Sequence, residues 1–359
     1  MRSNQLHRRR SPKTGRALVA IAILSVMITP LRAAAGSGID EQKIDQAIVR
    51  GLKYLERKQQ PSGAWRTGDH GESTAATSLA VMAFMAAGHV PGEGPYRDHL
   101  ERGIRWVISR QDGNGQLLQG RHGHGPMYSH GIATLMLAEV YGMVDSDLAD
   151  DVKNALERAI LLILKAQQVN KNNLNRGGWR YNFHSGDSDL SVTGWQLLAL
   201  RAAKDVGCDV PAASIDAAIS YVKRLSVPGH HGFGYDGPHG PTPARSGTGI
   251  TALEVCGDHH SPESLGAARF ILRRPLQPGD HYFYYGAYYC SVGLFKVGGH
   301  HWEQARPLLF RAILNRQNPN DGSWLSNQGH ESATGKNYCT SMAVLALAVE
   351  YRYLPIYQR

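Results

Sequence analysis

Residues 50–65 read RGLKYLERKQQPSGAW, and this stretch predicts a helix, its end and the loop that follows. Apolar residues recur there and just upstream at the spacing of an amphipathic helix: Ile44, Ala47, Ile48, Leu52 and Leu55. Gln59-Gln60-Pro61 ends this pattern, and Gly63-Ala64-Trp65 places an aromatic residue in a turn. A second, mostly apolar helix is expected over 74–87. The stretch therefore predicts a helical hairpin.

The same cycle of helix, Gln-rich turn, Gly-rich aromatic loop and apolar helix occurs six times. It is clear again where 317–324 reads QNPNDGSW and where 177–179 reads GGW, and it is degenerate in the other three copies. The hairpins are expected at about 41–88, 97–143, 149–206, 212–257, 262–298 and 302–353. The second helices align without gaps on a mostly small polar position: Ser78, Thr134, Gln196, Thr251, Ser291 and Ser341. This register predicts six equivalent helices.

The two kinds of helix predict two layers. The first helix of each hairpin is amphipathic, which suits an outer layer, whereas the second is apolar nearly all round and must be buried on both sides. An all-α fold, an α/α toroid (α6/α6 barrel), satisfies both patterns. An open solenoid is the alternative, but it needs a polar terminal repeat. Because residues 342–349 are as apolar as the middle helices, we expect a closed ring.

The N-terminus has the order of a secretory signal. Basic residues precede an apolar stretch at 17–31, and Ala33-Ala34-Ala35 offers a cleavage site, so 1–35 is predicted to be a signal peptide and 39–359 a single extracytoplasmic domain, periplasmic or secreted. An uncleaved N-terminal anchor is the alternative, and it is the only membrane contact we expect. Residues 1–35 carry seven Lys/Arg and no Asp/Glu, so cleavage lowers the formal charge from +9 to +2. Nucleic-acid binding is therefore not expected.

Four cysteines are too few to form a disulfide framework in a domain of this size. An oxidising compartment permits disulfides among Cys208, Cys256, Cys290 and Cys339, so their state stays open. There is no C-x-x-C pair, and we expect neither a structural zinc site nor a cofactor.

The segment from Arg50 to Trp65 resembles the QW repeat of squalene and oxidosqualene cyclases, which occurs weakly in protein prenyltransferase β-subunits. The resemblance covers all six hairpins and implies an α6/α6 toroid. A full triterpene cyclase has two helical domains, and this chain has room for one. In the prenyltransferases zinc is held by Asp, Cys and His, but Gly286 stands where that His belongs, so zinc-dependent prenyl transfer is not expected.

The resemblance also implies a catalytic acid. The cyclases protonate an alkene with the central acid of a DxDD motif, and Asp187-Ser188-Asp189-Leu190 is similar to it. Asp189 takes the proton-donating position and Asp187 the first, but Leu190 replaces the last Asp. Such an acid must be held protonated and away from water. The alternative is that these residues only cap a helix.

Aromatic and histidine side chains provide candidate ligand contacts. The predicted contacts are Trp179, Tyr181, His130, Tyr235, Tyr284 and Tyr338. The alternative for Trp65, Trp179 and Trp324 is that they plug neighbouring hairpins together. Ten histidines fall in the loops between first and second helices, and His122, His124 and His130 have a spacing that metal ligands can adopt; the alternative is a loop face that merely tolerates histidine.

Three functions remain open, because a fold alone does not choose among them. The first is an isomerase or transferase acting on a terpenoid lipid, with Asp189 as the acid. The second is a non-catalytic toroid that binds a lipid, peptide or partner. The third is a polysaccharide lyase or hydrolase, since Gly177-Gly178-Trp179-Arg180 is similar to a turn in pectate lyases. A deep apolar hole favours the first, a filled centre the second, and an open cleft lined by Arg, Lys and carboxylates the third.

Overall fold

The computed structural model describes residues 39–68, 71–120, 125–327 and 329–358. They belong to one compact unit, Ser37–Arg359. The predicted signal peptide lies outside the described residues and stays a prediction. The elements are α1 (Glu41–Lys58), α2 (Thr74–Ala86), α3 (Arg97–Ser109), α4 (Met127–Val140), α5 (Ser146–Gln167), α6 (Leu190–Asp205), α7 (Ala212–Arg224), α8 (Pro243–Val255), α9 (Pro262–Arg273), α10 (Phe283–Val297), α11 (Gly299–Leu314), α12 (Gly329–Leu347), η1 (Val349–Tyr351) and η2 (Pro355–Tyr357).

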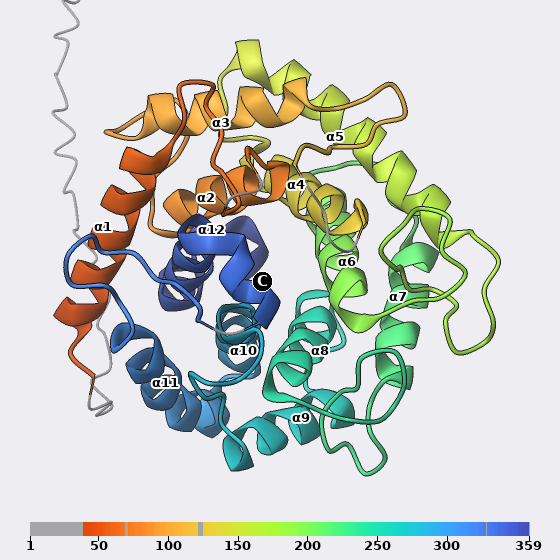
Figure 1. Ribbon diagram of the computed structural model, residues 1–359. Helices are drawn as coiled ribbons and strands as arrows, with labels where there is room; N and C mark the ends of the chain where they lie inside the picture. The colour runs from red at the N-terminus through yellow and green to blue at the C-terminus, as the bar shows by residue number, and fades with distance from the viewer. Residues whose placement is uncertain (1–38, 69–70, 121–124, 328, 359) are drawn as a thin grey trace, which may run out of the picture. The chain divides into compact units, whose positions relative to one another are not determined.

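The helices of this unit form two concentric rings (Figure 1). Each even-numbered helix packs against the next, from α2 through α10 to α12, and α12 packs against α2, so the inner ring is closed. The odd-numbered helices lie outside them, and α11 packs against α1. The predicted α/α toroid is confirmed. None of the helices in the described ranges is long and apolar enough to cross a membrane.

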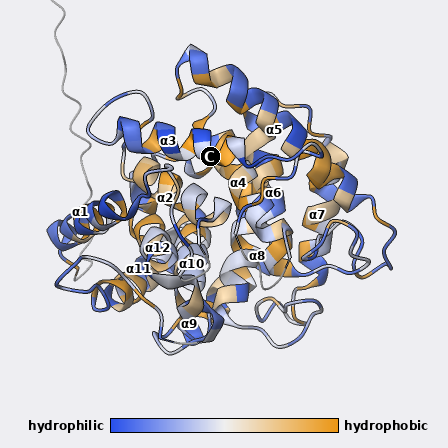
Figure 2. Cartoon of the chain, turned by 45° about the horizontal axis from the view of Figure 1, so that its top comes forward, coloured by the Kyte–Doolittle hydropathy of each residue, from blue (hydrophilic) through white to orange (hydrophobic). Residues whose placement is uncertain are grey.

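Hydropathy separates the two rings as the sequence predicts. Helix α1 buries one face only, whereas in α4 every residue except Tyr128 is buried. Figure 2 shows the same contrast, with α2 and α4 largely orange and the outer helices α1 and α3 blue on their outward side. Because the inner helices have neighbours on all sides, most of their side chains are buried and most of these are apolar or small.

Glutamine side chains bond four of the hairpins, the first, second, third and sixth, to the hairpin that follows in the ring. At the end of α1, the Gln59 amide donates to the carbonyl of Gly63 in its own loop and to that of His99 in α3, both at 2.8 Å. Gln111 and Gln167 repeat this pair of bonds. Gln317 donates to Gly322 at 2.9 Å and to Ala47 of α1 at 2.8 Å. The last hairpin is therefore bonded to the first in the same way as each of the first three hairpins is bonded to the one that follows it.

The loop tryptophans fill the junction between the rings. The indole N–H groups of Trp65, Trp179 and Trp324 donate to carbonyls of their own outer helices at 2.8–2.9 Å. Their backbone N–H groups donate to hydroxyls of the inner helices: Thr77, Thr193 and Thr340. All three tryptophans are at most 1% exposed, so they are packed between neighbouring hairpins, as the alternative for them predicts.

The same hydrogen bond corrects the predicted register of the inner helices. In the degenerate hairpins the equivalent acceptors are His130, for the Leu117 N–H, and Ser246, for the Phe233 N–H. The structurally equivalent residues are thus Thr77, His130, Thr193, Ser246 and Thr340, and not the ungapped column of the sequence. The column residues are all buried in inner helices, but the loops that precede them differ in length.

The centre of the inner ring is filled with aromatic side chains. Trp195 of α6 stacks on Tyr288 of α10 with centroids 5.7 Å apart, and Tyr289 packs edge-on against both. The C-terminal segment lies across the C-terminal ends of the inner helices: Ile356 N–H donates to Glu139 at 3.2 Å, and Lys296 donates to the Tyr357 carbonyl at 3.0 Å. The four cysteines are free thiols.

Candidate functional site

The N-terminal ends of the inner helices carry a cluster of polar and aromatic side chains, here called the mouth: Tyr128, Arg180, Tyr181, Asp189, Tyr235 and Tyr285. Backbone hydrogen bonds hold its loops together. The Met127 N–H at the start of α4 donates to the Tyr181 carbonyl at 3.0 Å. The Leu190 N–H at the start of α6 donates to the Tyr235 carbonyl at 2.8 Å. Each loop therefore lies over the first turn of the preceding inner helix.

Asp189 combines a helix cap with a buried carboxyl group. Its Oδ1 accepts the Val192 N–H at 2.9 Å, and its Oδ2 lies 3.6 Å from an Nη atom of Arg180. The side chain is fully buried, and this burial raises its pKa to about 7. Capping is thus observed, and the raised pKa is the property that an acid role requires. The roles of Asp189 and of the exposed Asp187 as catalytic groups stay predictions.

Arg180 is the central cation of the mouth. It follows Trp179, whose carbonyl accepts the Asp189 N–H at 2.9 Å, so the two side chains are brought together by a local backbone bridge. Its guanidinium lies 4.6 Å from the ring centroid of Tyr181 and 5.3 Å from that of Tyr235. It also contacts Asp187 at 3.3 Å, and 19% of its side chain is exposed. Carboxylates and aromatic faces thus fix a partly open guanidinium.

Tyrosine side chains lie near Arg180 and Asp189. The hydroxyls of Tyr181 and Tyr235 are hydrogen-bonded to each other, and the Tyr128 and Tyr181 rings lie 6.0 Å apart. The Tyr285 hydroxyl is 2.8 Å from that of Thr248. Burial raises the pKa values of Tyr128, Tyr235 and Tyr285, so these groups stay protonated and can donate hydrogen bonds.

Glu331 places a second buried carboxylate among these residues. It accepts the Tyr285 N–H at 3.0 Å and so caps α10, as Asp189 caps α6. Its side chain is only 2% exposed, and this burial raises its pKa. Tyr338 also lies here. Its pKa is raised mainly by burial and, to a smaller extent, by the negative charge of Glu331.

Three of the predicted ligand contacts are held in the packing of the fold, and their role as ligand contacts stays a prediction. Trp179 is one of the buried tryptophans that pack between the two rings. His130 is held between the Leu117 N–H at 3.2 Å and the Ala159 carbonyl at 3.1 Å, and burial lowers its pKa to about 4. Tyr284 is buried and donates to the Leu325 carbonyl at 3.4 Å. The structure brings Tyr181, Tyr235, Asp187 and Asp189 together, with Tyr338 beside Glu331.

Sequence reasoning missed Arg180, Tyr128, Tyr285 and Glu331 as site residues. Only Arg180 carries a sequence signal, since it directly follows the Gly-Gly-Trp turn. In the described part of the chain, no group of three His, Cys, Asp or Glu side chains has metal-ligand geometry. His122 and His124 of the metal hypothesis lie outside the described residues.

The Asp189 carboxyl predicts a pH dependence of stability. Its pKa is about 7 in the folded chain and about 3.9 in an unfolded one. Between these values the folded state binds more protons, so the stability that this group contributes is complete below about pH 4 and is lost as the pH rises through about 7. From about pH 5 to about pH 8, the free energy of unfolding should fall by about 2–3 kcal/mol more in wild type than in Asp189→Asn.

Urea unfolding of both proteins at the two pH values measures this difference. Taking the difference removes the contribution of other titrating groups, His130 included. Parallel pH profiles would contradict the account of this carboxyl.

Comparisons with known proteins give fold neighbours and no family. No family model and no curated protein matches the chain. The type II terpene cyclase MstE from Scytonema superposes with a TM-score of 0.58 at 13% identity, over 88% of this chain and 100% of its own.

Two further fold neighbours are proteins whose names connect them with sugars. An inactive variant of an α-1,6-mannanase from Salegentibacter sp., in complex with α-1,6-mannotriose, matches with a TM-score of 0.60 at 10% identity, over 85% of this chain and 99% of its own. A D-mannose isomerase matches with a TM-score of 0.61 at 13% identity, over 86% and 97% of the two chains. At these identities the likeness shows the fold alone.

Proposed function

We propose that this protein binds a carbohydrate chain at the mouth, with Arg180 as the central polar contact. The observation that carries the proposal is a partly exposed guanidinium, Arg180, between two partly exposed tyrosines, Tyr181 and Tyr235, above a ring whose centre is filled. A terpenoid chain needs an apolar cavity to bury its surface. Trp195, Tyr288 and Tyr289 occupy the place where such a cavity would lie. Ligands are therefore expected to bind at the surface of the mouth.

The residues of the mouth suit sugar rings. Tyrosine offers a flat apolar face together with a hydroxyl, and it loses little conformational entropy on binding. The fixed guanidinium of Arg180 offers several N–H donors to sugar oxygens. The mannanase among the fold neighbours binds mannotriose, which supports a glycan as a ligand class for this fold. A signal peptide at 1–35 would bring the domain to extracytoplasmic glycans.

A second candidate is an acid-catalysed isomerase that uses Asp189. One observation favours it, the pKa of about 7 that burial gives this carboxyl. A proton donor of this pKa is half protonated near neutral pH. The terpene cyclase MstE, solved with geranylgeranyl dihydroxybenzoate, shares the fold and supports a terpenoid as the alternative ligand.

Calorimetric titration separates the two candidates. We expect saturable binding of α-1,6-mannotriose and none of geranylgeranyl dihydroxybenzoate. Chromatography of both ligands after incubation shows whether either is converted. Saturable binding of the lipid without binding of the sugar, or conversion of the lipid, would contradict the proposal and favour the isomerase.

A further inference from the structure

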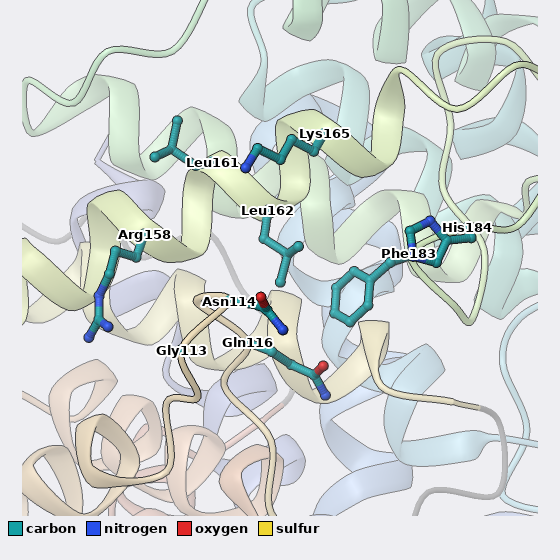
Figure 3. Close-up of a pocket in the computed structure, with 9 residues that line it drawn as sticks. All are labelled: Gly113, Asn114, Gln116, Arg158, Leu161, Leu162, Lys165, Phe183 and His184. Carbon is teal, nitrogen blue, oxygen red and sulfur yellow. The ribbon is translucent and has the colours of Figure 1, made fainter.

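A cleft outside the mouth has a different chemistry. It has a volume of about 510 Å³ and lies between the loop at 113–116, α5 and residues 183–184 (Figure 3). In Figure 3, Leu162, Asn114 and Phe183 face one another in the middle, with Arg158 at one end and His184 at the other. Lys165 adds a second permanent cation, and none of the described residues that line this cleft, here called the rim cleft, is a carboxylate. Its size is within the range of small-ligand sites.

The walls of the rim cleft are fixed before any ligand binds. The Asp112 carboxylate accepts the N–H groups of Asn114 at 2.9 Å and Gln116 at 3.0 Å, which sets the loop. Gln111 bonds this loop to the Ala155 carbonyl of α5 at 2.8 Å. The Phe183 ring packs edge-on against His130 with centroids 5.7 Å apart. A site ordered in advance loses less entropy when it binds.

The preceding hairpin forms an equivalent cleft. This second cleft has a volume of about 420 Å³ and is lined by Arg102, Arg105, Arg110 and Trp106, with Glu72 as the one carboxylate among its described lining residues. A Cβ atom on Gly63 would lie 2.6 Å from the Arg102 carbonyl oxygen, and one on Gly115 would lie 2.6 Å from that of Arg158. Each loop glycine thus packs on the next outer helix in the same way.

The two clefts are close neighbours. Arg110 lines the second cleft and Gly113 lines the rim cleft. Three residues of chain span at most about 11 Å, so the clefts follow each other closely around the outside of the toroid. Arg158 and Lys165 are exposed, and within the described ranges neither side chain forms an ion pair. Two repeats therefore present cations beside apolar side chains along one line.

We propose that the rim cleft, continued by its neighbour, binds an acidic glycan whose sugar units carry carboxylates. Repeated cationic clefts match a polymer with repeated negative charges, and Arg binds a carboxylate through two parallel N–H groups. Leu162 and Phe183 offer an apolar surface to the C–H face of a sugar ring, and Asn114 and Gln116 offer amides to its hydroxyls. The choice of a glycan over another polyanion rests on the function proposed above.

The test compares a cleft variant with a matched control. Arg158→Gln/Lys165→Gln removes two charges from the rim cleft, and Lys43→Gln/Arg311→Gln removes two exposed charges from α1 and α11. We expect a galacturonate oligosaccharide to bind the cleft variant about tenfold more weakly than wild type, a loss typical of two exposed charge pairs. The control variant should bind as wild type does.

Methyl-esterified galacturonate keeps the shape and loses the charge, so it should bind weakly to both variants and to wild type. Equal affinity of the cleft variant and wild type for galacturonate, or equally tight binding of the ester, would overturn the proposal. Binding of poly-glutamate as tight as that of galacturonate would overturn the glycan assignment and favour an acidic peptide.

Arg180→Met in the same assay separates this inference from the function of the mouth. If Arg180→Met leaves mannotriose binding intact while the cleft variant loses galacturonate, the mouth proposal fails and the rim proposal holds. If Arg180→Met abolishes mannotriose binding and the cleft variant keeps galacturonate, the rim proposal fails alone.

Discussion

Arg180→Met is expected to weaken the binding of mannotriose by roughly thirtyfold, because hydrogen bonds from a charged group contribute about 1.5–3 kcal/mol. The guanidinium is partly exposed and fixed by Tyr181 and Tyr235 on its faces and by Asp187 on its edge. Methionine keeps much of the side-chain length and removes every donor. Because the pKa of Asp189 is already about 7, this carboxyl can take up a proton when the cation is gone, so we expect the fold to persist.

Two further variants control for loss of charge and for loss of packing. Arg180→Lys keeps the charge without the planar fork, and we expect it to restore only part of the affinity. Arg352, which stacks on Phe295 at 5.0 Å near the C-terminal end of α10, offers a matched site away from the mouth. Arg352→Met should bind mannotriose as wild type does. Equal affinities of wild type and Arg180→Met, measured by calorimetry, would rule out the central role of Arg180.

Trp324→Ala is expected to lower the free energy of unfolding by about 4 kcal/mol, the usual loss when a buried tryptophan is truncated. The side chain is 1% exposed, and its indole N–H bonds the Ile313 carbonyl at 2.8 Å. Its ring also packs on Gly51 of α1, where a Cβ atom would lie 2.8 Å from it. Trp324 therefore joins the last hairpin to the first across the seam of the ring.

Trp65→Ala is the matched control within the ring. Trp65 packs on α3 at Gly103, where a Cβ atom would lie 3.2 Å from its ring. In a closed toroid the two variants should lose similar stability in urea unfolding, within about 1 kcal/mol. If Trp324→Ala costs far less than Trp65→Ala, the last hairpin is a free end and the ring is not closed.

The fold could be predicted from sequence because it repeats a local pattern. The last turns of the first helix, its Gln-rich end and the loop tryptophan all lie within residues 50–65, and copies of this stretch indicate the same hairpin elsewhere. The register of the inner helices could not be predicted in this way. The aligned residue comes one position after the acceptor in the first and last hairpins (Ser78 after Thr77, Ser341 after Thr340), but Thr134 comes four positions after His130 and Thr251 five after Ser246, so the column does not follow the acceptor.

The candidate site was predictable from sequence only for those of its residues that belong to one continuous segment of the chain. Asp187, Asp189 and Tyr181 come from a single loop and its helix cap, so their neighbourhood could be expected. Tyr128, Tyr285 and Glu331 come from α4, α10 and α12, and only the closed ring brings them together. The hydrogen bond of His130 to the loop could not be expected from sequence, because in its hairpin a histidine occupies the position that a threonine holds in others.

Hydroxyl-radical footprinting of tyrosines with and without mannotriose tests the central claim most directly. Tyr181 is a mouth residue. Tyr282 is 44% exposed and lies near it, since burial and then the charge of Tyr181 raise the pKa of Tyr282. Tyr353, 53% exposed, follows η1 at the other end of the inner helices and serves as the internal control. Binding at the mouth predicts slower oxidation of Tyr181 and Tyr282 in the saturated protein and no change at Tyr353. Unchanged oxidation of all three tyrosines at saturating sugar would contradict it.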